Sequence, residues 1–352
     1  MKIVADPNIP FVREAFAELG DITLVPGRQI TAAHLRDAEL LLIRSVTPVN
    51  AALLDGSRVQ FVATATIGTD HVDEQFLARR GIGFASAAGC NANSVAEYII
   101  AALLELAHRH KFRLRDKSLG VIGVGNVGSK VVRYARALGM RVLQNDPPLG
   151  LLEPATTADI VTVHVPLLET TRHMFHHDNL EGFILLNSSR GPVVDNRALL
   201  KAIDADRISA AVLDVWEGEP NISPELLDVV DLGTPHIAGY SFDGKVTGTR
   251  MIYEAACRHF ALPATWQPSL PAAQPVVVDA AGDDEDVLRE TIRQVYDITT
   301  DDSRLRANIR EFDKQRADYP VRREFFNTTL TLRGASATLR AKLAAVGFRL
   351  GA

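Results

Sequence analysis

The segment from residue 118 to residue 138 limits what this chain can fold into more than any other part of the sequence. A short apolar run, Ser-Leu-Gly-Val-Ile, leads directly into Gly-Val-Gly-Asn-Val-Gly, and apolar residues at helical spacing follow. This order predicts a strand, a tight turn and a helix. In such a unit the glycines serve the turn, the close approach of a pyrophosphate and the packing of helix on strand, and the helix N-terminus attracts phosphates. We therefore expect a dinucleotide at this turn, bound by Gly123, Gly125, Asn126, Val127 and Gly128.

A second predicted strand, residues 139–146, ends in a carboxylate. Asp146 lies 18 residues after Gly128, close to the spacing of about 20 at which such units place an acid on the ribose. A carboxylate accepts hydrogen bonds from the ribose hydroxyls and repels a 2′-phosphate. The sequence therefore favours NAD over NADP as the cofactor.

Length, charge and cysteine content narrow the class of protein. A chain of 352 residues is too long for one ordinary core and predicts two or three domains. Its net charge of −5 gives no reason to expect nucleic acid or an anionic membrane as a partner. The two cysteines, Cys90 and Cys257, cannot make a disulfide framework, and no signal-like start or membrane-spanning apolar run is visible. We expect a cytoplasmic protein without a metal site.

Residues 1–92 show short apolar strands that alternate with helical stretches. Strands are predicted at 2–5, 22–25, 40–45 and 61–66, and a helix at 10–19. Such alternation is typical of a parallel sheet, in which ligands bind beyond the carboxyl ends of the strands. Arg44, Ser45 and Thr66 occupy those ends and are candidate substrate contacts, although a solvated strand end would carry the same residues.

A long helix is predicted from Asn91, with small and apolar residues almost all round it, as suits a helix buried between two domains. Further strands follow at 159–166, 183–187 and 208–214, so the nucleotide unit extends to about residue 240. Four prolines between 263 and 275 indicate a linker. Beyond it, the pattern predicts a small α+β domain.

Ionisable residues follow the later strands of the nucleotide unit. Arg190 lies on a turn after a buried strand, where a guanidinium suits a substrate carboxylate or a carbonyl oxygen. His236 lies in a turn further on, and oxidation of an alcohol by NAD needs a group that takes the hydroxyl proton, as histidine can. Glu219 could orient the ring and favour its charged form. His236 alone would suit a structural role, but its combination with Arg190 and Glu219 favours catalysis.

Four motifs together resemble the D-isomer-specific 2-hydroxyacid dehydrogenases. They are the glycine motif, Asn-Ser-Ser-Arg-Gly at 187–191, Asp-Val-Trp-Glu-Gly-Glu-Pro at 214–220 and Thr-Pro-His-Ile-Ala-Gly-Tyr at 234–240. The resemblance implies three catalytic positions at Arg190, Glu219 and His236, with His236 as the acid/base. It implies substrate positions at Ser45, Thr66 and Tyr240, to which Arg44 is added. It implies NAD positions at Asp146, Val165, Asp214 and Gly239.

The tail is similar to a single subfamily. Val-Tyr-Asp at 295–297, Glu-Phe-Asp-Lys-Gln-Arg at 311–316 and Arg-Arg-Glu at 322–324 match it. That subfamily oxidises 4-phospho-D-erythronate with NAD in bacterial vitamin B6 synthesis, and its tail is a dimerisation domain, so the resemblance implies a phosphorylated hydroxy-acid substrate and a homodimer. The expected fold is α/β, with two Rossmann-like parallel-sheet domains and a small α+β dimerisation domain. The expected boundaries are 1–92 (completed by about 241–267) for substrate, 93–240 for NAD and 268–352 for the tail.

Two other functions remain open at this point. The chain could oxidise another D-2-hydroxy acid, such as phosphoglycerate, or it could be a non-catalytic NAD(H)-sensing regulator with the same fold. The chain also departs from the family in length, because only twelve residues separate Asp146 from Asp159, fewer than the helix usual there.

Overall fold

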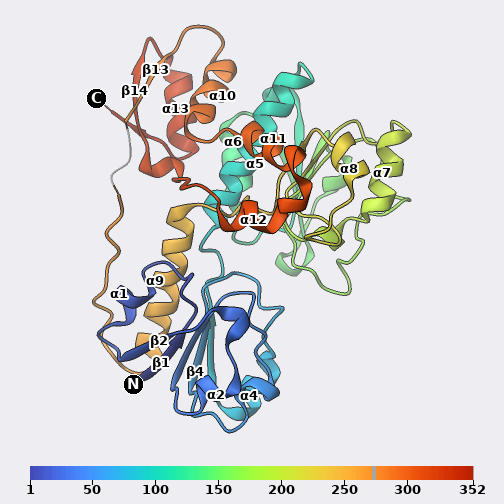
Figure 1. The fold of residues 1–352 in the computed structure, drawn as a ribbon. Helices are drawn as coiled ribbons and strands as arrows, with labels where there is room; N and C mark the ends of the chain where they lie inside the picture. The colour runs from blue at the N-terminus through green and yellow to red at the C-terminus, as the bar shows by residue number, and fades with distance from the viewer. Residues whose placement is uncertain (272–274, 352) are drawn as a thin grey trace. The chain divides into compact units, whose positions relative to one another are not determined.

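The computed structural model describes residues 1–271 and 275–351, and its contacts divide the chain into two units. Unit 1 comprises Met1–Asn91 and Phe242–Pro271, and unit 2 comprises Ala92–Ser241 and Ala272–Ala352 (Figure 1). Within the described residues, no helix is both long enough and apolar enough to span a membrane.

Unit 1 contains a five-stranded parallel sheet in the order β2-β1-β3-β4-β5. Its elements are β1 (Lys2–Ala5), α1 (Val12–Phe16), β2 (Asp21–Leu24), α2 (Ala32–Leu35), β3 (Leu40–Ile43), α3 (Ala51–Leu54), β4 (Phe61–Thr64), α4 (Glu74–Arg80), β5 (Gly83–Ser86) and α9 (Phe242–His259). The helix predicted over 10–19 is observed only as α1, because Phe11 has a φ of 56° and cannot belong to a right-handed helix.

Alternate side chains of these strands enter two separate cores. Leu40 and Leu42 pack with α1 and α9 on one face, whereas Leu41 and Ile43 pack with α2, α3 and α4 on the other. A strand buried on both faces has to be apolar at every position, which is why Leu-Leu-Leu-Ile forms β3.

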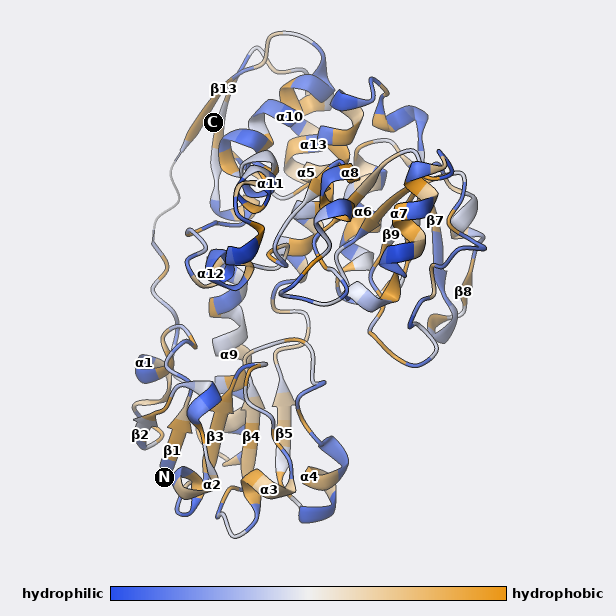
Figure 2. Cartoon of the chain, turned by 45° about the vertical axis from the view of Figure 1, so that its right-hand side comes forward, coloured by the Kyte–Doolittle hydropathy of each residue, from blue (hydrophilic) through white to orange (hydrophobic). Residues whose placement is uncertain are grey.

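Unit 2 is built on a seven-stranded sheet in the order β12-β11-β10-β9-β6-β7-β8, in which only β8 is antiparallel to its neighbour among the described strands. Its elements before the tail are α5 (Ala92–Arg109), β6 (Ser118–Ile122), α6 (Gly128–Ala137), β7 (Arg141–Asp146), β8 (Leu151–Leu152), β9 (Ile160–Val163), β10 (Ile184–Asn187), α7 (Asn196–Asp204), β11 (Ala211–Leu213), α8 (Pro224–Val229) and β12 (Leu232–Gly233). Helices α5 and α6 cover one face of the sheet, and α7 and α8 cover the other. Figure 2 shows the central strand β9 as largely hydrophobic.

The tail adds a three-stranded parallel sheet in the order β13-β14-β15. Its elements are β13 (Val276–Asp279), α10 (Asp284–Val295), α11 (Ile298–Ala307), α12 (Phe312–Ala317), β14 (Thr329–Arg333), α13 (Ala337–Ala345) and β15 (Arg349–Leu350). Helices connect the strands, and for this reason the strands of the predicted α+β tail can all run in parallel. The α/β fold with two larger parallel sheets is confirmed.

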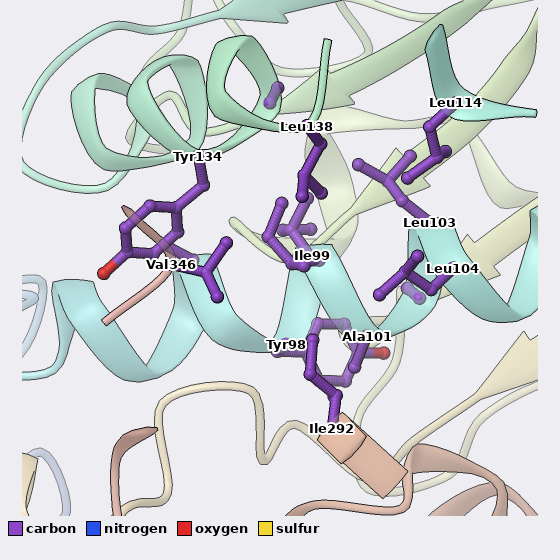
Figure 3. Packing of buried hydrophobic residues seen from close by; sticks show 14 of the residues in the cluster. Tyr98, Ile99, Ala101, Leu103, Leu104, Leu114, Tyr134, Leu138, Ile292 and Val346 are labelled. Carbon is purple, nitrogen blue, oxygen red and sulfur yellow. The ribbon is translucent and has the colours of Figure 1, made fainter. Parts of the chain in front are cut away.

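Helix α5 is the centre of unit 2. Fifteen of its eighteen residues are buried, and its apolar residues belong to the same core as α6 and the tail helices. Figure 3 shows Tyr98 near Ile292 of α10, while Tyr134 of α6 and Leu138, which follows α6, lie on another side of α5. The tail helices supply buried apolar side chains to this core. Each fully buried side chain of this size contributes roughly 1.5–3 kcal/mol to stability, so the tail is an integral part of the core.

Candidate active site

Three neighbouring strands of unit 2 lead to the predicted catalytic residues. Strands β10, β11 and β12 are parallel, with Asn187 opposite Leu213 and Leu213 opposite Gly233. Arg190, Glu219 and His236 follow these three strands in the chain. Since the carboxyl ends of parallel strands meet at one edge, the topology brings three separate loops to the same edge of the sheet.

His236 and Glu219 form a hydrogen-bonded pair. The His236 Nδ1 lies 2.8 Å from Glu219 Oε2, and the other carboxylate oxygen accepts a 2.8 Å hydrogen bond from the Trp216 backbone N–H. Burial opposes ionisation of Glu219. The hydrogen bond from His236, the positive charge of His236, the Trp216 N–H and the charge of Arg316 nevertheless hold the pKa of Glu219 below its usual value. With Glu219 ionised, Nδ1 donates to it and Nε2 is left for a substrate.

The loop that carries His236 is held by a buried carboxylate. Asp214 Oδ1 accepts hydrogen bonds from Thr234 Oγ1 and the Ile237 N–H, both at 2.7 Å, and its Oδ2 accepts from the Ala238 N–H at 3.0 Å. The His236 N–H donates to the Asp214 carbonyl at 2.7 Å, although His236 has an unfavourable φ of 56°. The surrounding bonds therefore fix a backbone conformation that histidine would rarely adopt alone.

Arg190 lies where two of the loops meet. A Cβ on the following residue, Gly191, would collide with the Trp216 carbonyl, so only glycine lets the 190–191 turn approach the loop that holds Glu219. The Arg190 Nη1 donates to the Ser189 carbonyl at 2.8 Å. Its side chain is half-buried on this turn.

The predicted nucleotide turn has the required shape. Gly123 has a φ of 86° and lies against the His164 carbonyl and Val165, while a Cβ on Gly128 would collide with the Gly123 carbonyl. A Cβ on Gly125 would meet no described atom within 4 Å, so its backbone is open to a ligand. Open backbone at the entry to α6 fits a pyrophosphate. Asn126 and Val127 lie on the same turn, with Asn126 exposed.

Asp146 lies at the end of β7, beside this turn. Its Oδ2 accepts a 2.7 Å hydrogen bond from the Val124 N–H. The carboxylate is thus oriented by the glycine motif itself, at the place where the sequence predicted the ribose contact.

The predicted substrate residues fall into both units. Arg44 and Ser45 follow β3, and Thr66 follows β4, in unit 1. Arg44 Nε donates to the buried Asp6 at 3.0 Å, and Thr66 Oγ1 lies 2.7 Å from Thr64 Oγ1.

Tyr240 belongs to unit 2. Gly239 and Asp214 are in the same unit, and the carboxylate of Asp214 is fully engaged by the His236 loop.

The sequence analysis noted residues 322–324 as a subfamily motif but gave them no role, and the structure shows that two of them support this loop. Arg322 is buried, and its Nη2 donates to the Ser94 carbonyl at 2.7 Å and to Ser94 Oγ at 2.6 Å, with a longer bond of 3.2 Å to the Ala238 carbonyl. Glu324 accepts from Ser241 Oγ at 2.6 Å and from Asn93 Nδ2 at 3.0 Å. These partners are 80 or more residues from the tail in sequence, so no local pattern could have revealed them.

Three further features lie outside the predicted site. His173 Nε2 lies 2.7 Å from Glu217 Oε1, forming a second histidine–carboxylate pair. The ligand atoms of His176, His177 and Asp178 lie within 4.8 Å of one another on the surface, but they come from three consecutive residues. A hollow of about 470 Å³ is lined by Pro235 and by tail residues including Tyr319, and none of the three predicted catalytic residues lines it.

The fold and this site define a class of protein. Residues 102–238 match the family described as the D-isomer specific 2-hydroxyacid dehydrogenase, NAD binding domain, and residues 270–347 match a domain of unknown function, DUF3410. The structure of D-lactate dehydrogenase from Aquifex aeolicus is similar in fold, with a TM-score of 0.61 and 24% identity over 74% of this chain and 95% of that chain. The chain is an NAD-dependent dehydrogenase of the 2-hydroxyacid class.

Relatives that are similar along the full length identify the family more narrowly. The erythronate-4-phosphate dehydrogenase of Cellvibrio japonicus (strain Ueda107) is 45% identical, with 99% of this chain and 100% of the relative covered. The enzyme of the same name from Proteus mirabilis (strain HI4320) is 43% identical, with 99% of each chain covered. The chain belongs to the erythronate-4-phosphate dehydrogenase family.

This chain is shorter than its alignment with the first relative, and one short connection was noted in the sequence. The first of these alignments extends over 380 positions, so it contains gaps in this chain of 352 residues. In the structure, β7 and β9 are joined by β8 and by short 3₁₀ turns at Pro147–Leu149 and Ala155–Thr157, without an α-helix. The short connection noted in the sequence is therefore folded as an antiparallel edge strand.

Proposed function

We propose that the chain oxidises C2 of 4-phospho-D-erythronate to give 2-oxo-3-hydroxy-4-phosphobutanoate, within vitamin B6 synthesis, and that it does so as a cytoplasmic homodimer. The observation that carries the chemistry is the 2.8 Å contact between His236 Nδ1 and Glu219 Oε2, which orients a histidine for proton transfer. The relatives' printed name supports the choice of substrate.

Bound NAD supplies the hydride acceptor. On the protein side, Gly123, Gly125 and Gly128 leave room for the pyrophosphate at the start of α6, and Asn126 and Val127 contribute to the same turn. Asp146 binds the adenosine ribose, while Val165 and Gly239 border the cofactor. Asp214 acts by holding the His236 loop in place.

His236 acts as the general base. Its Nε2 takes the proton of the C2 hydroxyl as C2 is oxidised, and returns a proton in the reverse reaction. Glu219 holds the ring through Nδ1, and its negative charge stabilises the imidazolium that forms.

Arg190 binds the substrate carboxylate and the C2 oxygen. A guanidinium offers two parallel N–H groups to a carboxylate, which fixes the orientation of C2 as well as its charge. Arg44, Ser45, Thr66 and Tyr240 complete the substrate contacts in this proposal.

The test compares two histidines that are both paired with carboxylates. His236→Ala should lower kcat for 4-phospho-D-erythronate about 10²- to 10⁴-fold, as expected for a lost general base, and leave NADH binding nearly unchanged. His173→Ala is the matched control, because its 2.7 Å pair with Glu217 has no catalytic role in the proposal. Near wild-type turnover by His236→Ala would exclude this role.

An assay of nicotinamide absorbance with a panel of phosphorylated and plain D-2-hydroxy acids separates this function from the two alternatives, another dehydrogenase and a regulator. If the wild-type kcat/KM for phosphoglycerate or an unphosphorylated D-2-hydroxy acid exceeded that for 4-phospho-D-erythronate, the proposed substrate would be wrong. NADH binding without turnover of any acid in the panel would favour a regulator.

A further inference from the structure

Arg316 of the tail lies beside Tyr240. It is on α12, a short and mostly hydrophilic helix (Figures 1 and 2). The Arg316 guanidinium carbon is 5.6 Å from the centre of the Tyr240 ring and 5.9 Å from that of Phe312. These distances are typical of cation–π contacts. Two aromatic side chains therefore hold this cation next to a predicted substrate residue.

The acidic pairing of Arg316 is weak. Its Nη1 is 3.4 Å from Asp313 Oδ1, and the Asp313 side chain is 59% exposed. Exposed ion pairs of this kind contribute little. The Arg316 Nε is buried and has no hydrogen-bond partner within the described residues. The guanidinium thus has hydrogen-bonding capacity that the folded chain does not use.

The charge of Arg316 also reaches the catalytic pair. Burial raises the pKa of Glu219, and Arg316 is one of the groups, after His236 and Trp216, that lower it below the usual value. The side chains of Arg316, His236 and Glu219 are 26%, 31% and 22% exposed, so all three are accessible to a ligand. Arg316 and the catalytic pair are therefore partly exposed residues of unit 2, and the charge of Arg316 acts on Glu219.

We propose that Arg316 is a further substrate-binding residue, whose guanidinium binds the phosphate at the far end of the substrate from the carboxylate. This inference rests on the proposed function. In that reaction Arg190 and His236 act on the carboxylate and C2, which leaves the C4 phosphate without an assigned partner. A phosphate dianion suits an arginine, which offers it parallel N–H donors in a fixed plane. The tail would then determine which hydroxy acids the enzyme accepts.

The test is a comparison of two substrates that differ only in the phosphate. Arg316→Gln should lower kcat/KM for 4-phospho-D-erythronate about 10- to 100-fold, as expected when a hydrogen bond to a charged group is lost. It should change kcat/KM for D-erythronate less than about 3-fold. Inorganic phosphate should inhibit the wild-type enzyme competitively and the variant more weakly. Arg310→Gln, an exposed arginine just before α12, is the matched control and should change neither substrate.

Each other outcome is decisive. An equal loss for both substrates with a shifted pH profile would show that Arg316 acts only through Glu219, and would overturn the proposal. Unchanged kinetics with intact NADH binding would overturn it too, as would loss of phosphate selectivity in Arg44→Gln but not in Arg316→Gln. If the wild-type enzyme did not prefer the phosphorylated acid, the proposed function itself would fail, whatever the variant did.

Discussion

The two carboxylates Asp214 and Glu219 have different roles in the candidate site because their surroundings differ. Asp214 is buried, and although burial raises its pKa, hydrogen bonds from Thr234, Ile237 and Ala238 occupy both oxygens. Glu219 is half-buried and keeps one oxygen on His236. The first carboxylate can only position the loop, whereas the second can respond to proton transfer.

Glu219→Gln should shift the acid limb of the oxidation profile to lower pH. The pKa of Glu219 is lowered, so the residue is charged throughout the working range. A neutral amide no longer stabilises the positive charge that forms on the ring, so oxidation should persist to lower pH. The measurement is kcat/KM against pH. An unmoved acid limb would contradict the pairing in solution.

Asp146→Ala should weaken NAD binding and relax discrimination against NADP. The Asp146 carboxylate lies beside the glycine turn, bonded to the Val124 N–H, where it would bind ribose and repel a 2′-phosphate. We expect an increase of about 10- to 100-fold in the KM for NAD, from loss of hydrogen bonds to a charged group. Titration with both cofactors measures this, and Asp116→Ala, an exposed site, is the control. Equal affinities before and after would remove Asp146 from the ribose site.

At the scale of elements, polar side chains join the starts of neighbouring strands. Asp159, just before β9, accepts hydrogen bonds from the Ser118 Oγ and N–H at 2.6 and 2.8 Å, at the first residue of β6. These bonds, with the nearby Lys117, lower the pKa of Asp159 to about 2. They help to fix the register of the two central strands.

Asp159→Asn should destabilise the fold in a pH-dependent way. Because the folded pKa is depressed, the stabilisation is present above the unfolded value of 3.8 and is lost as the pH falls towards 2. Asp159 is 42% exposed, so we discount the shift and expect about 0.5–1 kcal/mol. Urea unfolding should show this difference at pH 7 and a smaller one at pH 3. The control Asp228→Asn, at an exposed position, should not change the free energy of unfolding at either pH. An equal loss of stability at pH 7 and pH 3 for Asp159→Asn would contradict the assignment of the effect to the charge of Asp159.

At the scale of the whole molecule, the tail serves the core as well as the proposed dimer. Leu288, Ile292, Leu343 and Val346 belong to the core built around α5. Removal of residues after about 276 would expose this apolar surface, so the truncated chain should be insoluble rather than a clean monomer. The dimer has to be tested on the tail surface instead.

Val321→Asp should weaken the proposed homodimer without unfolding the protein. Val321 is 71% exposed and lies in the tail, to which the proposed dimer contact is assigned, so an aspartate there should disturb that contact without entering the core. Sedimentation should show the wild-type chain as a dimer and the variant shifted towards monomer, with an unchanged circular dichroism spectrum. Leu152→Asp, 72% exposed on β8, is the control. A variant that still sediments as a dimer would place the contact elsewhere.

The sequence determined the elements whose pattern is local. The apolar runs predicted β3, β4, β6, β9 and β10, because hydrophobic period is a property of neighbouring residues. Glycine spacing and turn position are local in the same way, and they led to the candidate nucleotide turn and the candidate catalytic residues. It did not predict β5, because Gly-Phe-Ala-Ser has no run of branched apolar residues and becomes a strand only by pairing with β4.

Only the tertiary structure decided which distant residues meet. It joined Ala238 to Arg322 across 84 positions and Tyr240 to Arg316 in the tail, whereas the pairing of His236 with Glu219 was already expected from the sequence. A hydrogen bond or cation–π contact depends on distance in space, and chain separation carries no signal of it. The sequence therefore specified which chemical groups the protein has, and the packing of the tail against α5 decided which of them lie around His236.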